Sequence, residues 1–198
     1  MKRYTIILCL WGLLFSNCYS QEYSKSAIQY GVGISLSGAT EYNTSSGREI
    51  IVGYKRDIWK DRLRLNPNLV LGYFKGEIWE DNLRDQSFNT IQLRVLLDYD
   101  LIRYKRVSLN TEIGGIIGKS LGLKGTGFTH DRISYEDIPE TKSEYIDRLN
   151  IGGVIGGGIR YSFLGGRYAV KFMPLNIHLG NGFHEIHSYV SVDIKLKE

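Results

Sequence analysis

The sequence predicts an all-β chain folded as an eight-stranded antiparallel up-and-down β-barrel. Apolar and polar residues alternate with a period of two in eight segments, which is the pattern of strands with two unlike faces. Helical spacing is scarce after residue 20. The connections between the segments are alternately long and short, as expected when successive strands run up and then down.

The first 20 residues predict a secretory signal peptide that is removed. Lys2 and Arg3 form a basic start, residues 6–15 form an apolar core of ten residues, and a stretch of small and polar residues precedes a cleavage site between Ser20 and Gln21. The apolar core is shorter than the roughly 20 residues that a membrane-spanning helix needs. Residues 21–198 are then expected to form a single domain that contains no cysteine, because Cys9 and Cys18 both lie in the removed segment.

The segments that alternate set the expected strands. Those near 48–58 and 62–74 alternate less cleanly than the others. The segment near 167–178 changes phase at Met173 and Pro174, which predicts a β-bulge there. The eight expected strands are residues 27–38, 48–58, 62–74, 88–101, 107–118, 151–163, 167–178 and 186–196.

The expected connections differ in length in a regular way. Long and tight connections alternate, so all long ones emerge at one end of the barrel and all tight ones at the other. This asymmetry is typical of barrels in outer membranes, which have short periplasmic turns and longer outside loops. The expected connections are residues 38–47, 58–61, 75–87, 102–105, 119–146, 164–166 and 179–183.

The glycine-rich strand at 151–163, which reads "IGGVIGGGIRYSF", indicates which face points inward. The interior of an eight-stranded barrel is only wide enough for side chains to fill, so the inward face must be the smaller one. Gly152, Gly156 and Gly158 share a face with polar residues such as Arg160, whereas isoleucines occupy the opposite face. The sequence therefore predicts a polar lumen and an apolar outer wall, that is, a transmembrane barrel.

Together these features resemble the small eight-stranded outer-membrane β-barrels of diderm bacteria, the OmpA/OmpX-like, porin-family fold. The resemblance covers residues 25–198 and rests on the signal peptide, the eight alternating segments and the alternating loop lengths. It implies a location in the outer membrane, with outer-membrane lipids and the barrel-insertion machinery as partners. Such barrels usually end in an aromatic residue, whereas this chain ends "IKLKE", where Leu196 would take that place. Aromatic side chains on the apolar faces fit interface girdles: Tyr30, Tyr54, Tyr73, Tyr99, Tyr161 and Phe163.

The charged residues on the polar faces are expected to form a salt-bridged network in the lumen, because buried charges must be paired. Arg94 and Glu112, on adjacent strands, are expected to belong to one network. A lumen filled in this way predicts no general diffusion pore. The network residues are Arg94, Asp98, Glu112, Arg148, Arg160, Asp193 and Lys195.

The longest loops are where recognition is expected, because loops on rigid scaffolds carry binding function. Acidic and aromatic residues there predict an outside surface for a protein, a glycan or a divalent cation, and the resulting role is envelope-structural or surface-binding. The candidate residues are Phe128, Asp131, Tyr135, Glu136, Asp137, Trp79 and Glu80.

Two alternatives stay open. A soluble exported barrel similar to lipocalins would bind an apolar ligand inside. A lipid hydrolase that resembles the lipid A deacylases would use His178, His187, Ser188 and Glu185, although Gly180 occupies the position of the serine in that family's motif.

The sequence predicts no cofactor and no metal ligands, since His184 and Glu185 point to opposite faces of a regular strand. Removal of Lys2 and Arg3 lowers the formal net charge from +4 to +2, which does not favour a nucleic-acid partner.

Overall fold

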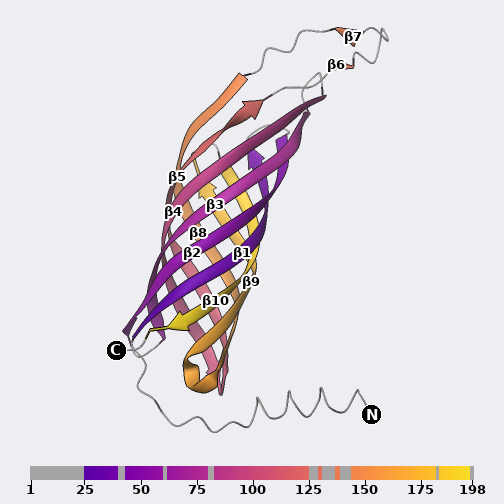
Figure 1. Ribbon diagram of the computed structural model, residues 1–198. Coiled ribbons are helices and arrows are strands. Elements are labelled where there is room, and N and C mark those ends of the chain that lie inside the picture. Colours follow the sequence, from indigo (N-terminus) through magenta and orange to yellow (C-terminus); the bar gives the residue numbers. More distant parts are fainter. Residues whose placement is uncertain are drawn as a thin grey trace, which may run out of the picture.

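The chain forms a closed antiparallel barrel (Figure 1). The structure is a computed structural model that describes residues 25–39, 43–59, 62–79, 83–124, 129–130, 137–138, 144–181 and 183–196. The eight barrel strands lie in the order β1-β10-β9-β8-β5-β4-β3-β2, and pairing of β1 with β10 closes the wall. They are β1 (Ser26–Ala39), β2 (Asn43–Trp59), β3 (Leu63–Trp79), β4 (Leu83–Tyr104), β5 (Val107–Lys124), β8 (Glu144–Phe163), β9 (Tyr168–Gly180) and β10 (Phe183–Lys195).

Short elements connect the strands at both ends. A two-stranded ladder of β6 (Thr129–His130) and β7 (Asp137–Ile138) lies between β5 and β8, and the 3₁₀ turn η1 (Leu164–Gly166) joins β8 to β9. We call the end that carries β6 and β7 the loop end, and the end that carries η1 and both chain ends of the barrel the turn end (Figure 1). At the turn end, the Leu196 amide donates to the Ser26 carbonyl oxygen at 2.9 Å, which joins the two chain ends.

The expected strand number and pairing are confirmed, but several strands are longer than predicted. β1 ends at Ala39 and β2 begins at Asn43, where the sequence predicted a connection over 38–47. Similarly, β3 and β4 extend into the expected loop 75–87, and β5 and β8 extend into 119–146. Backbone pairing continues beyond the segments in which apolar and polar residues alternate in the sequence. Strands of 13 to 22 residues exceed the 9 to 11 that cross a bilayer.

The predicted division of the wall into two faces is confirmed. Ile34 exposes 67% of its surface on the outer wall, whereas the adjacent Ser35 exposes 3% and points into the lumen. The lumen also holds apolar side chains among its polar ones. Phe74 and Phe88 stack at a centroid distance of 4.9 Å near the loop end. Two further apolar clusters lie deeper in the lumen: Ile51, Val70, Met173 and Tyr189, and Leu96, Ile116 and Val154.

The predicted irregularity in β9 is present. Its pairing with β10 shifts between His187 and Tyr189, opposite Pro174 and Leu175. Inward positions are odd-numbered up to Met173 and even-numbered from Asn176 onward. Proline has no amide hydrogen to donate to a neighbouring strand, so it is tolerated at such a bulge. The bulge places both Lys171 and His178 in the lumen.

The glycines of β8 serve the narrow inner face of the wall. A Cβ at Gly152 would overlap the Leu179 carbonyl oxygen of β9. A Cβ at Gly153, which points outward, would meet the Gly114 carbonyl oxygen at an ordinary 3.7 Å. Inward Cβ positions converge because the wall curves tightly, so only glycine fits at some of them.

This geometry predicts opposite effects at two adjacent positions. Gly152→Ala should lower the free energy of unfolding by roughly 1–3 kcal/mol, because the new methyl group overpacks the wall. Gly153→Ala should leave it unchanged or raise it by about 0.5 kcal/mol, because alanine loses less backbone entropy on folding. Urea unfolding of the two variants in lipid vesicles measures the difference. Equal losses of stability would show that the inner face is not crowded.

The outer wall carries an aromatic girdle at the turn end. Tyr54 is exposed there, and Tyr161, Phe163 and Tyr168 follow one another at centroid distances of 6.3 and 5.7 Å. Tyrosine suits a membrane–water interface, because its ring is apolar and its hydroxyl polar. The expected signal peptide, residues 1–20, lies outside the described residues.

Among the residues that the structure describes, no helix combines the length and the apolar character needed to cross a membrane.

Candidate functional site in the barrel lumen

Buried ion pairs cross the middle of the lumen. Lys171 Nζ donates to Asp98 Oδ2 at 3.0 Å and to Glu112, and Tyr189 Oη donates to Glu112 Oε2 at 2.6 Å. Lys55 Nζ contacts the Asp193 carboxylate at 2.9 Å and Asp98 Oδ2 at 3.4 Å. Arg160 Nε lies 3.4 Å from Asp193, so three cations balance three carboxylates. We call this group the central cluster: Lys55, Asp98, Glu112, Arg160, Lys171, Tyr189 and Asp193.

The ion pairs continue toward the turn end. Arg64 binds the Asp100 carboxylate with both terminal nitrogens, at 3.0 and 2.7 Å, and its Nε lies 3.2 Å from Asp57. Arg103 contacts the same Asp100 at 2.6 Å. A pocket of about 200 Å³ opens among these side chains. The bidentate Arg64–Asp100 contact holds β3 and β4 in fixed relative positions at this end, because a bidentate ion pair requires a specific geometry.

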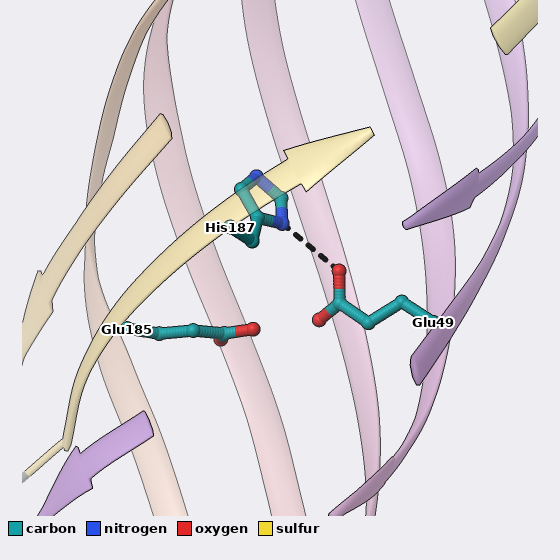
Figure 2. A group of neighbouring side chains, drawn as sticks. All are labelled: Glu49, Glu185 and His187. Carbon is teal, nitrogen blue, oxygen red and sulfur yellow. Dashed lines mark hydrogen bonds and ion pairs between the residues drawn. The ribbon is translucent and has the colours of Figure 1, made fainter. Parts of the chain in front are cut away.

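A second buried group lies on the loop-end side of the central cluster. His187 Nδ1 lies 2.9 Å from Glu49 Oε2, and Arg94 Nη2 donates to Glu49 Oε1 at 3.0 Å. His178 Nδ1 lies 3.1 Å from Glu185 Oε2, and Ser35 donates to Glu185 Oε1. Figure 2 shows Glu49 and His187 joined by this contact, with the Glu185 carboxylate beside them. We call this group the histidine cluster: Ser35, Glu49, Gln92, Arg94, His178, Glu185 and His187.

Arg94 is held in the histidine cluster by the amide of Gln92. The side-chain oxygen Oε1 of Gln92 accepts from Arg94 Nε at 3.0 Å and from Nη2 at 2.6 Å. The guanidinium therefore faces Glu49 and His187 in a fixed orientation. The two histidine rings meet edge to face at a centroid distance of 4.3 Å. The histidine cluster is thus built from five strands and holds two carboxylates, one permanent cation and two imidazoles close together.

The structure places the seven expected lumen residues in different surroundings. Asp98, Glu112, Arg160 and Asp193 meet in the central cluster, with Arg160 Nε 3.4 Å from Asp193. Arg94 lies in the histidine cluster instead. Arg94 and Glu112 both line a cavity of about 10 Å³, but each is bonded to other partners, so their membership of one network stays a prediction.

Two expected lumen residues lie at its ends. Arg148 is exposed, because it lies on the part of β8 that extends beyond the filled lumen. The prediction that Arg148 belongs to the buried network is therefore wrong. Lys195 lies at the turn end, 24% exposed, with Nζ 3.7 Å from Asp57. Strand parity gave the correct face for both residues, but parity carries no information on depth along the barrel axis.

Sequence reasoning missed the buried partners Glu49, Lys55 and Lys171. A signal was present for the first two, because outward Ile50, Val52 and Tyr54 place the odd-numbered residues of β2 inside. The inward Ile51 obscured that alternation. Lys171 was hidden by the phase change at the bulge.

The hydrolase arrangement does not form. His178, His187 and Glu185 are buried in the lumen, whereas the Ser188 hydroxyl donates to the Pro174 carbonyl oxygen across the bulge. The serine therefore does not meet the histidines. As predicted, His184 is exposed and Glu185 is buried. A lipocalin-like interior is also contradicted, because the charges lie inside and the aliphatic side chains outside.

The structure describes two of the expected recognition residues, Trp79 and Asp137. Phe128, Asp131, Tyr135, Glu136 and Glu80 lie outside the described residues. Trp79 was expected in a loop but is the last residue of β3, paired with Leu83. Asp137 belongs to β7 and pairs with His130.

Comparison with known proteins supports the fold. Neisserial surface protein A (NspA) matches with a TM-score of 0.59 and 10% identity, over 89% of this chain and 100% of that one. The attachment invasion locus protein Ail of Yersinia pestis, in complex with the heparin analogue sucrose octasulfate, matches with a TM-score of 0.50 and 12% identity, over 88% and 100%. No protein-family model and no curated protein sequence matches the chain.

The fold and the polar lumen define the class of protein to which this chain belongs. The protein is a small eight-stranded barrel of the outer-membrane type, with the OmpA/OmpX-like fold.

Proposed function

We propose that this protein is a closed, non-conducting anchor in the outer membrane whose loop end binds a partner at the cell surface. Residues 1–20 direct its export and are removed. The loop end faces outward and the turn end faces the periplasm, in keeping with the longer outside loops of such barrels.

The filled lumen carries the proposal. The central cluster and the histidine cluster draw side chains from β1, β2, β4, β5, β8, β9 and β10, and their members are almost fully buried. The space between the two clusters is about 10 Å³, enough for about one water molecule. An ion that passed through would have to break several buried pairs, each of which is costly to open because it leaves a charge uncompensated.

The purified barrel should show no stepwise conductance in planar bilayers at neutral pH. Folding is checked by the heat-dependent gel shift of the barrel, and a general porin in the same bilayers serves as the positive control. Open channels in most incorporated barrels would contradict a closed anchor.

The loop end offers a specific surface for an anionic partner. A groove of about 710 Å³ lies on the outer wall across β10, β1, β2 and β3. Arg48 and Lys75 line it together with Tyr73 and the outward-facing Ile34, Leu36 and Ile186. Arg48 is paired with Tyr73 and Lys75 with Ser46, so the two cations are diagonal neighbours on one face. The similar Ail structure holds a sulfated heparin analogue. A sulfated or phosphorylated glycan is therefore the partner that this surface favours.

Binding of sucrose octasulfate tests this surface role. Arg48→Gln and Lys75→Gln should each weaken binding roughly 10- to 100-fold, because each removes a charge-assisted contact of about 1.5–3 kcal/mol. Lys105→Gln removes an exposed cation at the turn end and should change binding little. Calorimetry in detergent measures all three variants. An effect of Lys105→Gln as large as the others would reduce the binding to unspecific charge.

A further inference from the structure

The histidine cluster contains a side-chain arrangement that the closed-anchor function does not use. Glu49 comes from β2, and Glu185 and His187 come from β10, on either side of β1. One potential ligand atom from each of these residues lies within 4.8 Å of the other two. All three side chains are almost completely buried. Figure 2 shows them converging from two sides of the lumen.

Small residues on β1 allow this convergence. Gly33 is paired with Glu49 on one side and Tyr189 on the other, and Ser35 is paired with Gly47 and His187. A Cβ at Gly33 would lie 3.7 Å from Glu49 Oε2 and 3.1 Å from Tyr189 Cβ. Larger side chains at Gly33 and Ser35 would occupy the space between the Glu49 and His187 side chains. The strand therefore leaves room for Glu49 to reach His187.

Neighbouring groups orient the three side chains. Ser35 and His178 both contact Glu185, one at each carboxylate oxygen. Arg94 holds Oε1 of Glu49, which leaves Oε2 directed at His187. Hydrogen-bond partners of this kind are what orient the ligands of protein metal sites. Arg94 also offsets one of the two carboxylate charges, so a divalent ion would not leave a large net charge in the lumen.

We propose that Glu49, Glu185 and His187 bind a divalent transition-metal ion in the lumen, and zinc fits them best. Zinc accepts imidazole nitrogen and carboxylate oxygen at about 2.0–2.2 Å, in sites where three protein ligands leave a fourth position open. His187 Nδ1 and Glu49 Oε2 lie 2.9 Å apart, so one of the two carries the proton between them, and the ion displaces that proton to solvent. The ion then joins β2 to β10 across β1 and stabilises the closure of the barrel.

The surroundings predict slow release of the ion. Phe74 and Phe88 stack on the loop-end side of the cluster. Gly72 lies against both the Phe74 ring and the Glu49 side chain, so the aromatic pair adjoins the site. The central cluster fills the lumen on the other side. Zinc is therefore expected to enter during folding and to be retained afterwards.

Folding with and without zinc tests the proposal. The mature chain refolded in detergent with zinc chloride should retain about one zinc ion per barrel after washing with EDTA, measured by atomic absorption. Glu185→Gln and His187→Asn should each weaken zinc binding at least about 100-fold, since removal of partners beyond the ligands alone can cost that much. His184→Asn is the matched control, because His184 lies on the same strand but is exposed.

A measurement on the unmodified chain covers the case in which the variants do not fold. X-ray absorption of the zinc-loaded barrel should show oxygen ligands and scattering from imidazole. The proposal is overturned if the folded wild-type barrel retains no zinc. It is equally overturned if His184→Asn abolishes binding, or if the bound zinc shows no imidazole ligand.

Discussion

Lys171→Met should lower the free energy of unfolding by about 3–5 kcal/mol, the largest effect expected in this barrel. Methionine fills a similar volume, but Asp98 and Glu112 both lose a cation within hydrogen-bond distance. These carboxylates are fully buried. Urea unfolding in lipid vesicles, followed by tryptophan fluorescence, measures the change.

The same substitution on the outer wall is the control. Lys119 pairs with Asp147 at 3.0 Å, but both side chains are more than half exposed. Exposed ion pairs contribute about 0–1 kcal/mol, so Lys119→Met should change stability little. If both variants lose equal stability, the central cluster does not carry the stability assigned to it.

A double-mutant cycle identifies the partners within the lumen. Lys171→Met and Glu112→Gln should couple by about 1–3 kcal/mol, because the two side chains are in direct contact. Arg94→Met and Glu112→Gln should couple much less, because Arg94 is bonded to Glu49 and Gln92. Equal coupling in both cycles would favour a single network over two clusters.

Val95→Arg should cost about 2–4 kcal/mol in lipid vesicles and reduce the folding yield. Val95 is 46% exposed on the outer wall, at the centre of the outward-facing residues of β4 that run from Ile91 to Tyr99. An arginine there meets hydrocarbon at the membrane midplane. Asn89→Arg introduces the same charge on the same face of the same strand, beyond the apolar belt, and should cost about 0–1 kcal/mol.

The heat-dependent gel shift and urea unfolding measure both variants. A cost at Asn89 equal to that at Val95 would contradict the placement of the membrane. The comparison depends on lipid, so the difference between the two variants should shrink in detergent micelles.

The sequence by itself determined the strand number, the antiparallel order and the two faces of the wall. These properties depend on alternation between neighbouring residues, and the wall separates two very different environments. The small size of the glycine-rich face then placed the polar residues inside. Asp98, Glu112, Arg160 and Asp193 could be assigned to the lumen in this way. The bulge at Pro174 also had a local signal, since proline cannot donate to a neighbouring strand.

Only the tertiary structure decided which charges meet, where the strands end and how deep each residue lies. Side chains meet across the lumen according to the stagger of the closed sheet, which joins residues as distant as Glu49 and His187. Parity encodes neither that stagger nor the depth of a residue along the barrel axis, so Arg148 was placed in the buried network. Strand ends were misplaced because backbone pairing continues beyond the residues that alternate between apolar and polar. The histidine cluster needed both the bulge in β9 and the narrow strand β1, and neither the partners nor the distances within it follow from local sequence.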